Sequence, residues 1–171
     1  MSSGSLGIGF SGATGIAFGA HATDSAFRTY VMIGDGECNE GIVWEAAHVA
    51  SRHRLSNLVA IVDHNKLQQF GWRGETAAER LSPYTGNQLV DRWRAFDWEV
   101  LEVDGNNIAA FLDVMDTARD ADGPVAVIAH TVKGKGVSYM ENNYPWHSQV
   151  PNAEEYAIAL RELGENPGGE A

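Results

Sequence analysis

The segment TYVMIGDG at residues 29–36 carries the clearest evidence about the fold, together with LVAIVDHNKL at residues 58–67. In each segment, an unbroken apolar run rich in β-branched residues ends in polar residues. Short runs of this kind are typical of strands that are buried on both faces of a parallel sheet. Two later runs are similar, although one of them alternates in part. We therefore expect parallel strands at Thr29–Ile33, Leu58–Val62, Glu99–Val103 and Val125–Ala129.

Helical patterns separate and follow these strands. They predict helices over Glu40–His53, Ile108–Arg119 and Glu154–Leu163. Alternating strands and helices are typical of an α/β protein, in which helices cover a parallel sheet. The sequence thus predicts a three-layer α/β/α domain over residues 1–163, followed by a flexible tail at residues 164–171.

The opening segment, Leu6–His21, is rich in glycine, which destabilises a helix by about 1 kcal/mol per residue relative to alanine. Gly12, Gly15 and Gly19 would share one face of a helix, and such a bare face lets a backbone or a ligand come close. We expect a closely packed helix whose N-terminal end points at a ligand; a loop without a special role is the alternative. A domain that starts in this way also suggests that a sheet edge or a covering layer lies outside the chain.

Composition and charge argue against several classes of protein. The chain has 44% hydrophobic residues, 20% charged residues and a net charge of −11, which suits a globular domain and disfavours a nucleic-acid partner. No apolar run is long enough for a membrane span, and the first residues do not resemble a secretion signal. Cys38, the single cysteine, is expected to be a packed residue rather than a nucleophile. We predict a cytoplasmic protein that acts on a small molecule, without membrane contact.

Polar residues stand directly after the first two predicted strands, with Asp35 after the first and Asn65 after the second. The carboxyl ends of neighbouring parallel strands share one edge of the sheet, where ligands of α/β proteins bind. A carboxylate, an amide oxygen and a nearby backbone carbonyl form the hard-oxygen set that Mg²⁺ takes, usually with phosphates and water. Polar residues after strands are also common turn formers, so the spacing alone leaves both explanations open.

The combination of Gly34-Asp35-Gly36 with Asn65 at the next strand tip resembles the fingerprint of the thiamine diphosphate enzymes. This resemblance implies the thiamine diphosphate-binding fold. It also implies that Asp35, the side chain of Asn65 and the backbone carbonyl of Leu67 hold Mg²⁺ on the diphosphate of the cofactor.

Further segments resemble the transketolase family within that group. Residues 4–9, GSLGIG, are similar to a loop in which a glycine and a leucine touch the cofactor, here Gly4 and Leu6. Residues 34–41, GDGECNEG, are similar to the transketolase form of the fingerprint, which places Gly34 and Gly36 against the cofactor.

The resemblance also implies catalytic residues. Glu40 and Glu45 correspond to a carboxylate network near the dimer interface, and His147 to a histidine that contacts the diphosphate and the donor substrate. The loop KGKGVS at residues 133–138 resembles the loop that covers the cofactor. Solvated helix glutamates and a packed loop histidine are the alternatives, and Lys133 and Lys135 are expected to be surface charges.

Two parts of a transketolase have no match in this sequence. One is the stretch that normally precedes the loop at residues 4–9 and carries substrate-facing histidines, and the other is the pyrimidine-binding domain. Some transketolase-like enzymes are divided between two chains. The resemblance therefore implies a subunit of a hetero-oligomer, of the α2β2 type, that needs a pyrimidine-domain partner chain. The implied activity is transfer of a two-carbon ketol or acyl unit from a sugar or keto substrate.

Two alternatives remain open for the function. The chain could be a subunit of another thiamine diphosphate enzyme, such as a 2-oxoacid decarboxylase or dehydrogenase. It could also be a non-catalytic assembly subunit.

Overall fold

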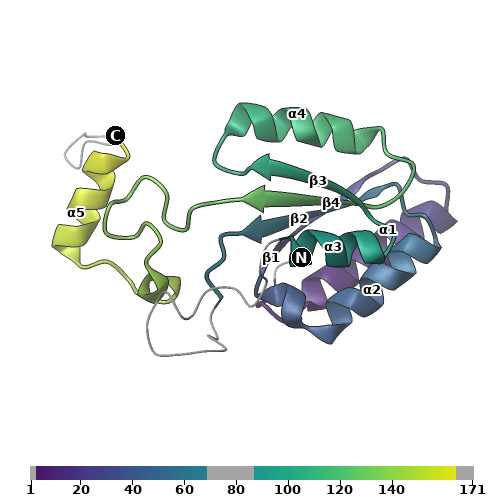
Figure 1. Cartoon of the computed structure of the whole chain (residues 1–171), viewed down its shortest axis with the longest axis horizontal. Coiled ribbons are helices and arrows are strands. Elements are labelled where there is room, and N and C mark those ends of the chain that lie inside the picture. The colour runs from purple at the N-terminus through teal and green to yellow at the C-terminus, as the bar shows by residue number, and fades with distance from the viewer. Residues whose placement is uncertain (1–2, 69–86, 165–171) are drawn as a thin grey trace.

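A computed structural model of the chain describes residues 3–68 and 87–164. Within these residues, the strands form a single four-stranded parallel sheet in the order β1-β2-β4-β3 (Figure 1). Their bounds are Thr29–Gly34 for β1, Leu58–His64 for β2, Glu99–Asp104 for β3 and Val125–His130 for β4. Each strand lies where the sequence predicts it and extends one or two residues further at its carboxyl end. The predicted tail lies outside the described residues, except for its first residue, Gly164.

The predicted helices are present, and one α-helix among the described residues was not predicted. The predicted ones are α1 (Ile8–Ala22), α2 (Gly41–Arg52), α4 (Ile108–Arg119) and α5 (Ala153–Glu162). The missed one is α3 (Gln88–Ala95), whose buried residues are Leu89, Val90 and Trp93. A helix this short, with only three buried positions among charged neighbours, gives too little periodic signal.

Helices cover both faces of the sheet, as predicted. Figure 1 shows α1, α2 and α3 on one face and α4 on the other. On the first face, Ile128 belongs to a core with Phe10 and Trp93, whose rings meet edge to face with centroids 5.7 Å apart. On the second face, Val127 lies in a smaller core with Ala118 of α4. The three-layer α/β/α architecture is therefore confirmed.

The glycine-rich opening segment forms the predicted helix, and its close packing comes from its alanine face. Ala13, Ala17 and Ala20 are buried, together with Phe10. On the other face, no described atom lies within 4 Å of where a Cβ on Gly15 or Gly19 would be. Apart from the helix's own backbone, Gly15 and Gly19 therefore have no close neighbour within the part of the chain that the structure describes.

One edge and part of one face of the sheet are open. Among the described residues, β1 pairs only with β2, and α4 makes most of its sheet contacts with β3 and β4. The side chains of Tyr30 and Met32 on β1 are consequently exposed, by 49% and 68%.

The C-terminal helix stands apart from the three layers. Figure 1 shows α5 beyond the carboxyl ends of the strands, where a loop after β4 connects it to the sheet. Asn152 caps α5 and forms a capping box with Glu155, so the start of this helix is well defined. Nothing among the described helices is long and apolar enough to cross a membrane.

Candidate functional site

A cavity of about 1110 Å³ opens at the carboxyl ends of β1 and β2. Its lining comes from the chain before α1, from α1 and β1 themselves, and from the loops after β1, β2 and β4. Most of the residues singled out from the sequence are in its lining, namely Gly4, Gly34, Asp35, Gly36, Glu40, Asn65, Leu67 and His147.

The pairing of β1 with β2 brings Asp35 and Asn65 into this one cavity. The register places Gly34 beside Asp63, so the residues that follow each strand leave the sheet side by side. The Asp35 N–H donates to the Asp63 carbonyl at 3.0 Å, and the Lys66 N–H donates to Asp35 Oδ2 at 2.9 Å. The backbone of Lys66 is left-handed (φ 66°), a conformation that residues other than glycine, asparagine and aspartate rarely adopt. The two loops are thus hydrogen-bonded into one wall.

Asp35 is a buried acid without a cationic partner among the described residues. Its side chain is 2% exposed, and none of the ion pairs between described residues includes it. Burial, and to a smaller extent the nearby Asp63 carboxylate, raise the pKa of Asp35 from 3.8 to about 6, although hydrogen bonds from the backbone N–H groups of Lys66 and Gly36 act in the opposite direction. A cation bound beside this carboxylate would favour its ionised form.

Asn65 and Leu67 line the same cavity as Asp35 and carry further hard oxygen atoms. Asn65 Oδ1 accepts the Leu67 N–H at 2.9 Å, which folds the chain so that both residues line the cavity. One carboxylate, one amide oxygen and one backbone carbonyl suit Mg²⁺ with additional phosphate oxygens. The described residues contain no cluster of three or more histidine, cysteine or acidic side chains that could hold a metal ion.

Two buried polar residues of the cavity were missed from the sequence. Gln68 is 3% exposed, and its Oε1 accepts a hydrogen bond from Asn39 Nδ2 at 2.7 Å. Glu37 is 8% exposed and accepts hydrogen bonds from two backbone N–H groups. Glu37 follows Gly36, and Gln68 follows Leu67, so both are next to residues of the predicted site. Nothing in the sequence distinguishes them from ordinary loop residues; their burial in the structure does.

The loop after β4 brings Lys133 and His147 to the cavity. Lys133 is partly buried and lines the cavity, whereas Lys135 is exposed and pairs with Glu141 at 3.8 Å, as expected of a surface lysine. His147 is exposed and follows Trp146, whose ring lies 4.9 Å from that of Tyr139.

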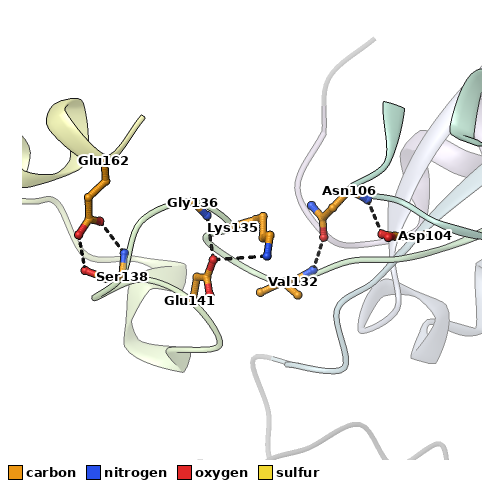
Figure 2. A network of polar contacts seen from close by, with 8 residues as sticks. All are labelled: Asp104, Asn106, Val132, Lys135, Gly136, Ser138, Glu141 and Glu162. Carbon is orange, nitrogen blue, oxygen red and sulfur yellow. Dashed lines mark hydrogen bonds and ion pairs between the residues drawn. The ribbon is translucent and has the colours of Figure 1, made fainter. Parts of the chain in front are cut away.

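Side-chain oxygens hold this loop at three places (Figure 2). Asn106 Oδ1 accepts the Val132 N–H at 2.8 Å, directly before Lys133. Glu141 Oε1 accepts the Gly136 N–H at 2.9 Å. On α5, Glu162 accepts both the N–H and the hydroxyl of Ser138, at 2.7 and 2.6 Å, which lowers the pKa of Glu162. The loop is therefore braced from the sheet side and from α5.

Leu6, Glu40 and Glu45 are exposed, like His147. Leu6 is 57% exposed and is not among the residues that line the cavity. Glu40 lines the cavity at the start of α2, whereas Glu45 is exposed further along the same helix and is not in the lining. Contact of Leu6 with a cofactor and a role of the two glutamates at an interface remain predictions.

Other notable side chains lie outside the cavity. Cys38 is fully buried in the core, and burial raises the pKa of its thiol, so it is the packed residue that the sequence predicted. His64 is buried with its ring 5.2 Å from that of His130, and its Nδ1 has no hydrogen-bond partner within the described residues. His130 Nε2 lies 3.0 Å from Glu102 Oε2. No local pattern signals this histidine pair, which only strand register brings together.

Comparison with known proteins agrees with this architecture. Residues 1–170 match the family described as transketolase, thiamine diphosphate binding domain. A protein of Phocaeicola vulgatus that is named as one subunit of apulose-4-phosphate transketolase is 43% identical over 169 residues, which cover 96% of this chain and 57% of that protein. The 6-deoxy-6-sulfo-D-fructose transketolase subunit SqwG of a Clostridium species is 38% identical over 164 residues, covering 95% and 57%.

Solved structures place the fold in the same family. The crystal structure of transketolase from Campylobacter jejuni superposes with a TM-score of 0.86 at 26% identity, covering 98% of this chain and 26% of that one. The chain spans just over half the length of the two relatives named above. The match over nearly all of its residues leads to one conclusion: this chain belongs to the transketolase family, as a thiamine diphosphate-binding domain.

Proposed function

We propose that this chain is a subunit of a transketolase-like enzyme and carries the diphosphate and the metal of its cofactor. The observation that supports this most is the buried Asp35 carboxylate, which shares a cavity with Asn65 and Leu67 and pairs with no described cation. The proposed donors to Mg²⁺ are the Asp35 carboxylate, the Asn65 amide oxygen and the Leu67 carbonyl. Thiamine diphosphate supplies the ability to cleave and form a carbon–carbon bond next to a carbonyl group.

The residues around the metal set have separate tasks in this proposal. Gly34 and Gly36 let the backbone come close to the diphosphate, because neither has a side chain to keep it away. Gly4 lines another part of the cavity, in the segment before α1. The braced loop carries Lys133 and His147 to the cavity, where Lys133 contributes positive charge and His147 contributes a hydrogen bond toward diphosphate oxygens or substrate.

Partner protein completes the active site in this proposal. Two relatives are named as transketolase subunits, and the chain covers 57% of each. We expect a second chain with a pyrimidine-binding domain and a hetero-oligomer in which Glu40 and Glu45 lie near the interface. The exposure of both glutamates leaves them available for such contacts.

The substrate class follows from the same relatives. One is named for a ketose phosphate and the other for a ketose that bears a sulfonate group. We therefore expect the donor to be a small ketose with a terminal anionic group, from which a two-carbon ketol unit is transferred to an aldehyde.

Calorimetry tests the cofactor assignment most directly. Thiamine diphosphate is titrated into the chain with and without Mg²⁺, alone and mixed with the chains encoded beside its gene. Wild-type protein should bind only with Mg²⁺, and Asp35→Ala should not bind. Equal binding by the two proteins would remove Asp35 from the metal site.

A transfer assay on the reconstituted complex then tests the reaction. Formation of a ketose two carbons longer from an added aldehyde supports ketol transfer. Release of carbon dioxide from a 2-oxoacid would instead identify the alternative enzyme class, and cofactor binding without either reaction would identify an assembly subunit.

A further inference from the structure

Glu37 is a buried carboxylate in the wall of the cavity that belongs neither to the proposed metal set nor to the covering loop. It is 8% exposed and begins a short 3₁₀ helix, Glu37–Asn39, directly after Gly34-Asp35-Gly36. A buried carboxylate is costly unless its oxygens accept hydrogen bonds. Its partners therefore indicate what it does.

The two oxygens of Glu37 accept from two loops that are distant in sequence. Oε1 accepts the Gly7 N–H at 2.8 Å, and Oε2 accepts the Gly34 N–H at a longer 3.4 Å. Gly7 follows the segment 3–5, which lines the cavity, and Gly34 begins the turn that carries Asp35. One side chain thus connects two backbone segments that both border the proposed diphosphate position.

The start of α1 has no side-chain cap of its own, and Glu37 accepts the N–H of its cap residue, Gly7. Gly7 is the cap residue, without a side chain to accept a hydrogen bond, and the first turn of α1 contains no acidic residue. Helix N-termini carry partial positive charge and unsatisfied N–H groups, which a carboxylate stabilises. Gly7 is also left-handed (φ 71°), and a Cβ there would lie 2.5 Å from Ile42 Cγ2, so its position is tightly set.

We propose that Glu37 is a positioning residue that sets the separation between the segment before α1 and the Gly34–Gly36 turn. With both its oxygens directed at backbone N–H groups, it holds the two walls at the distance that one diphosphate-bearing ligand requires. This proposal rests on the proposed function, since it takes the ligand of the cavity to be thiamine diphosphate with Mg²⁺.

Variants of Glu37 separate positioning from simple folding. Glu37→Gln keeps one acceptor oxygen and the size of the side chain, whereas Glu37→Ala removes both acceptors. Loss of hydrogen bonds to a charged acceptor predicts about tenfold weaker binding of thiamine diphosphate in Glu37→Gln and about a hundredfold in Glu37→Ala. In the reconstituted enzyme, KM for the cofactor should rise by similar factors while kcat at saturating cofactor changes little, because Glu37 touches no reacting atom.

A matched control is Glu155→Gln, which changes a carboxylate that also accepts a backbone N–H, from Asn152 at 2.8 Å, but lies outside the cavity lining. This control should bind the cofactor like wild type. Wild-type affinity in Glu37→Ala, or a loss of kcat without a rise in KM, would overturn the positioning role.

Amide exchange distinguishes failure of this inference from failure of the proposed function. If the wild-type chain binds no cofactor even with its partner, the proposed function fails. Exchange of the Gly7 and Gly34 N–H protons, followed by NMR, still decides whether Glu37 joins the two loops. Faster exchange at both sites in Glu37→Ala, with partial rescue in Glu37→Gln, is expected; unchanged exchange would refute the connection.

Discussion

Replacing Asp35 with asparagine should stabilise the chain in the absence of metal and cofactor. The substitution keeps an oxygen that can accept the Lys66 N–H, which donates to Asp35 Oδ2 at 2.9 Å. It removes a carboxylate that is 2% exposed and next to Asp63. A buried carboxylate that binds a cation is expected to destabilise the protein when the cation is absent.

The size of the effect follows from the pKa of Asp35. The folded pKa of about 6 lies above the ordinary 3.8, so the folded chain binds this proton more tightly than the unfolded chain. Stability therefore falls as the pH rises from about 4 to about 6 and stays lower above that range. At about 1.4 kcal/mol per pKa unit, the full difference corresponds to roughly 3 kcal/mol. For a chain of this size, that is about 6–12 °C in melting temperature.

Thermal and urea unfolding at pH 4 and pH 8, with chelator present, measure this difference. Asp35→Asn and wild type should be nearly equal at pH 4, where both side chains are neutral, and the variant should be more stable at pH 8. Added Mg²⁺ and thiamine diphosphate should stabilise wild type and leave the variant unchanged. Equal stability of the two proteins at pH 8, or a less stable variant, would refute the account of Asp35 as a buried acid that awaits a cation.

Three further predictions concern the elements that position the site. Gly7→Ala should destabilise the chain by about 2 kcal/mol or more in urea unfolding, because of its left-handed φ of 71° and the contact with Ile42; wild-type stability would contradict this. Trp93→Ala should cost about 3–5 kcal/mol by the same assay, since Trp93 is fully buried in the larger core, and a loss below about 1 kcal/mol would show that α3 packs differently. Glu162→Ala should speed hydrogen exchange in the loop around Ser138 without changing that of β2, as followed by mass spectrometry; unchanged exchange in the loop would mean that α5 does not brace it.

Most of the architecture could be predicted because it depends on local patterns. Apolar runs of strand length, separated by segments with helical periodicity, predict a parallel sheet covered by helices. This prediction does not depend on which side chains come into contact in the folded chain. The positions of Asp35 and Asn65 followed from the same logic, since residues after neighbouring parallel strands must emerge at one edge. The exception is α3, where three buried residues in a short, charged segment do not form a readable pattern.

Periodicity and the direction of a parallel sheet were thus enough to predict the strands, the main helices and the two strand tips that meet. Three features of the site needed the three-dimensional packing: Glu37 reaches Gly7, Lys133 lines the cavity, and Leu6 does not. Burial and hydrogen-bond partners depend on contacts between segments that are distant in the chain. The sequence of a loop has no periodicity that indicates burial or hydrogen-bond partners, so these can be known only from the folded structure.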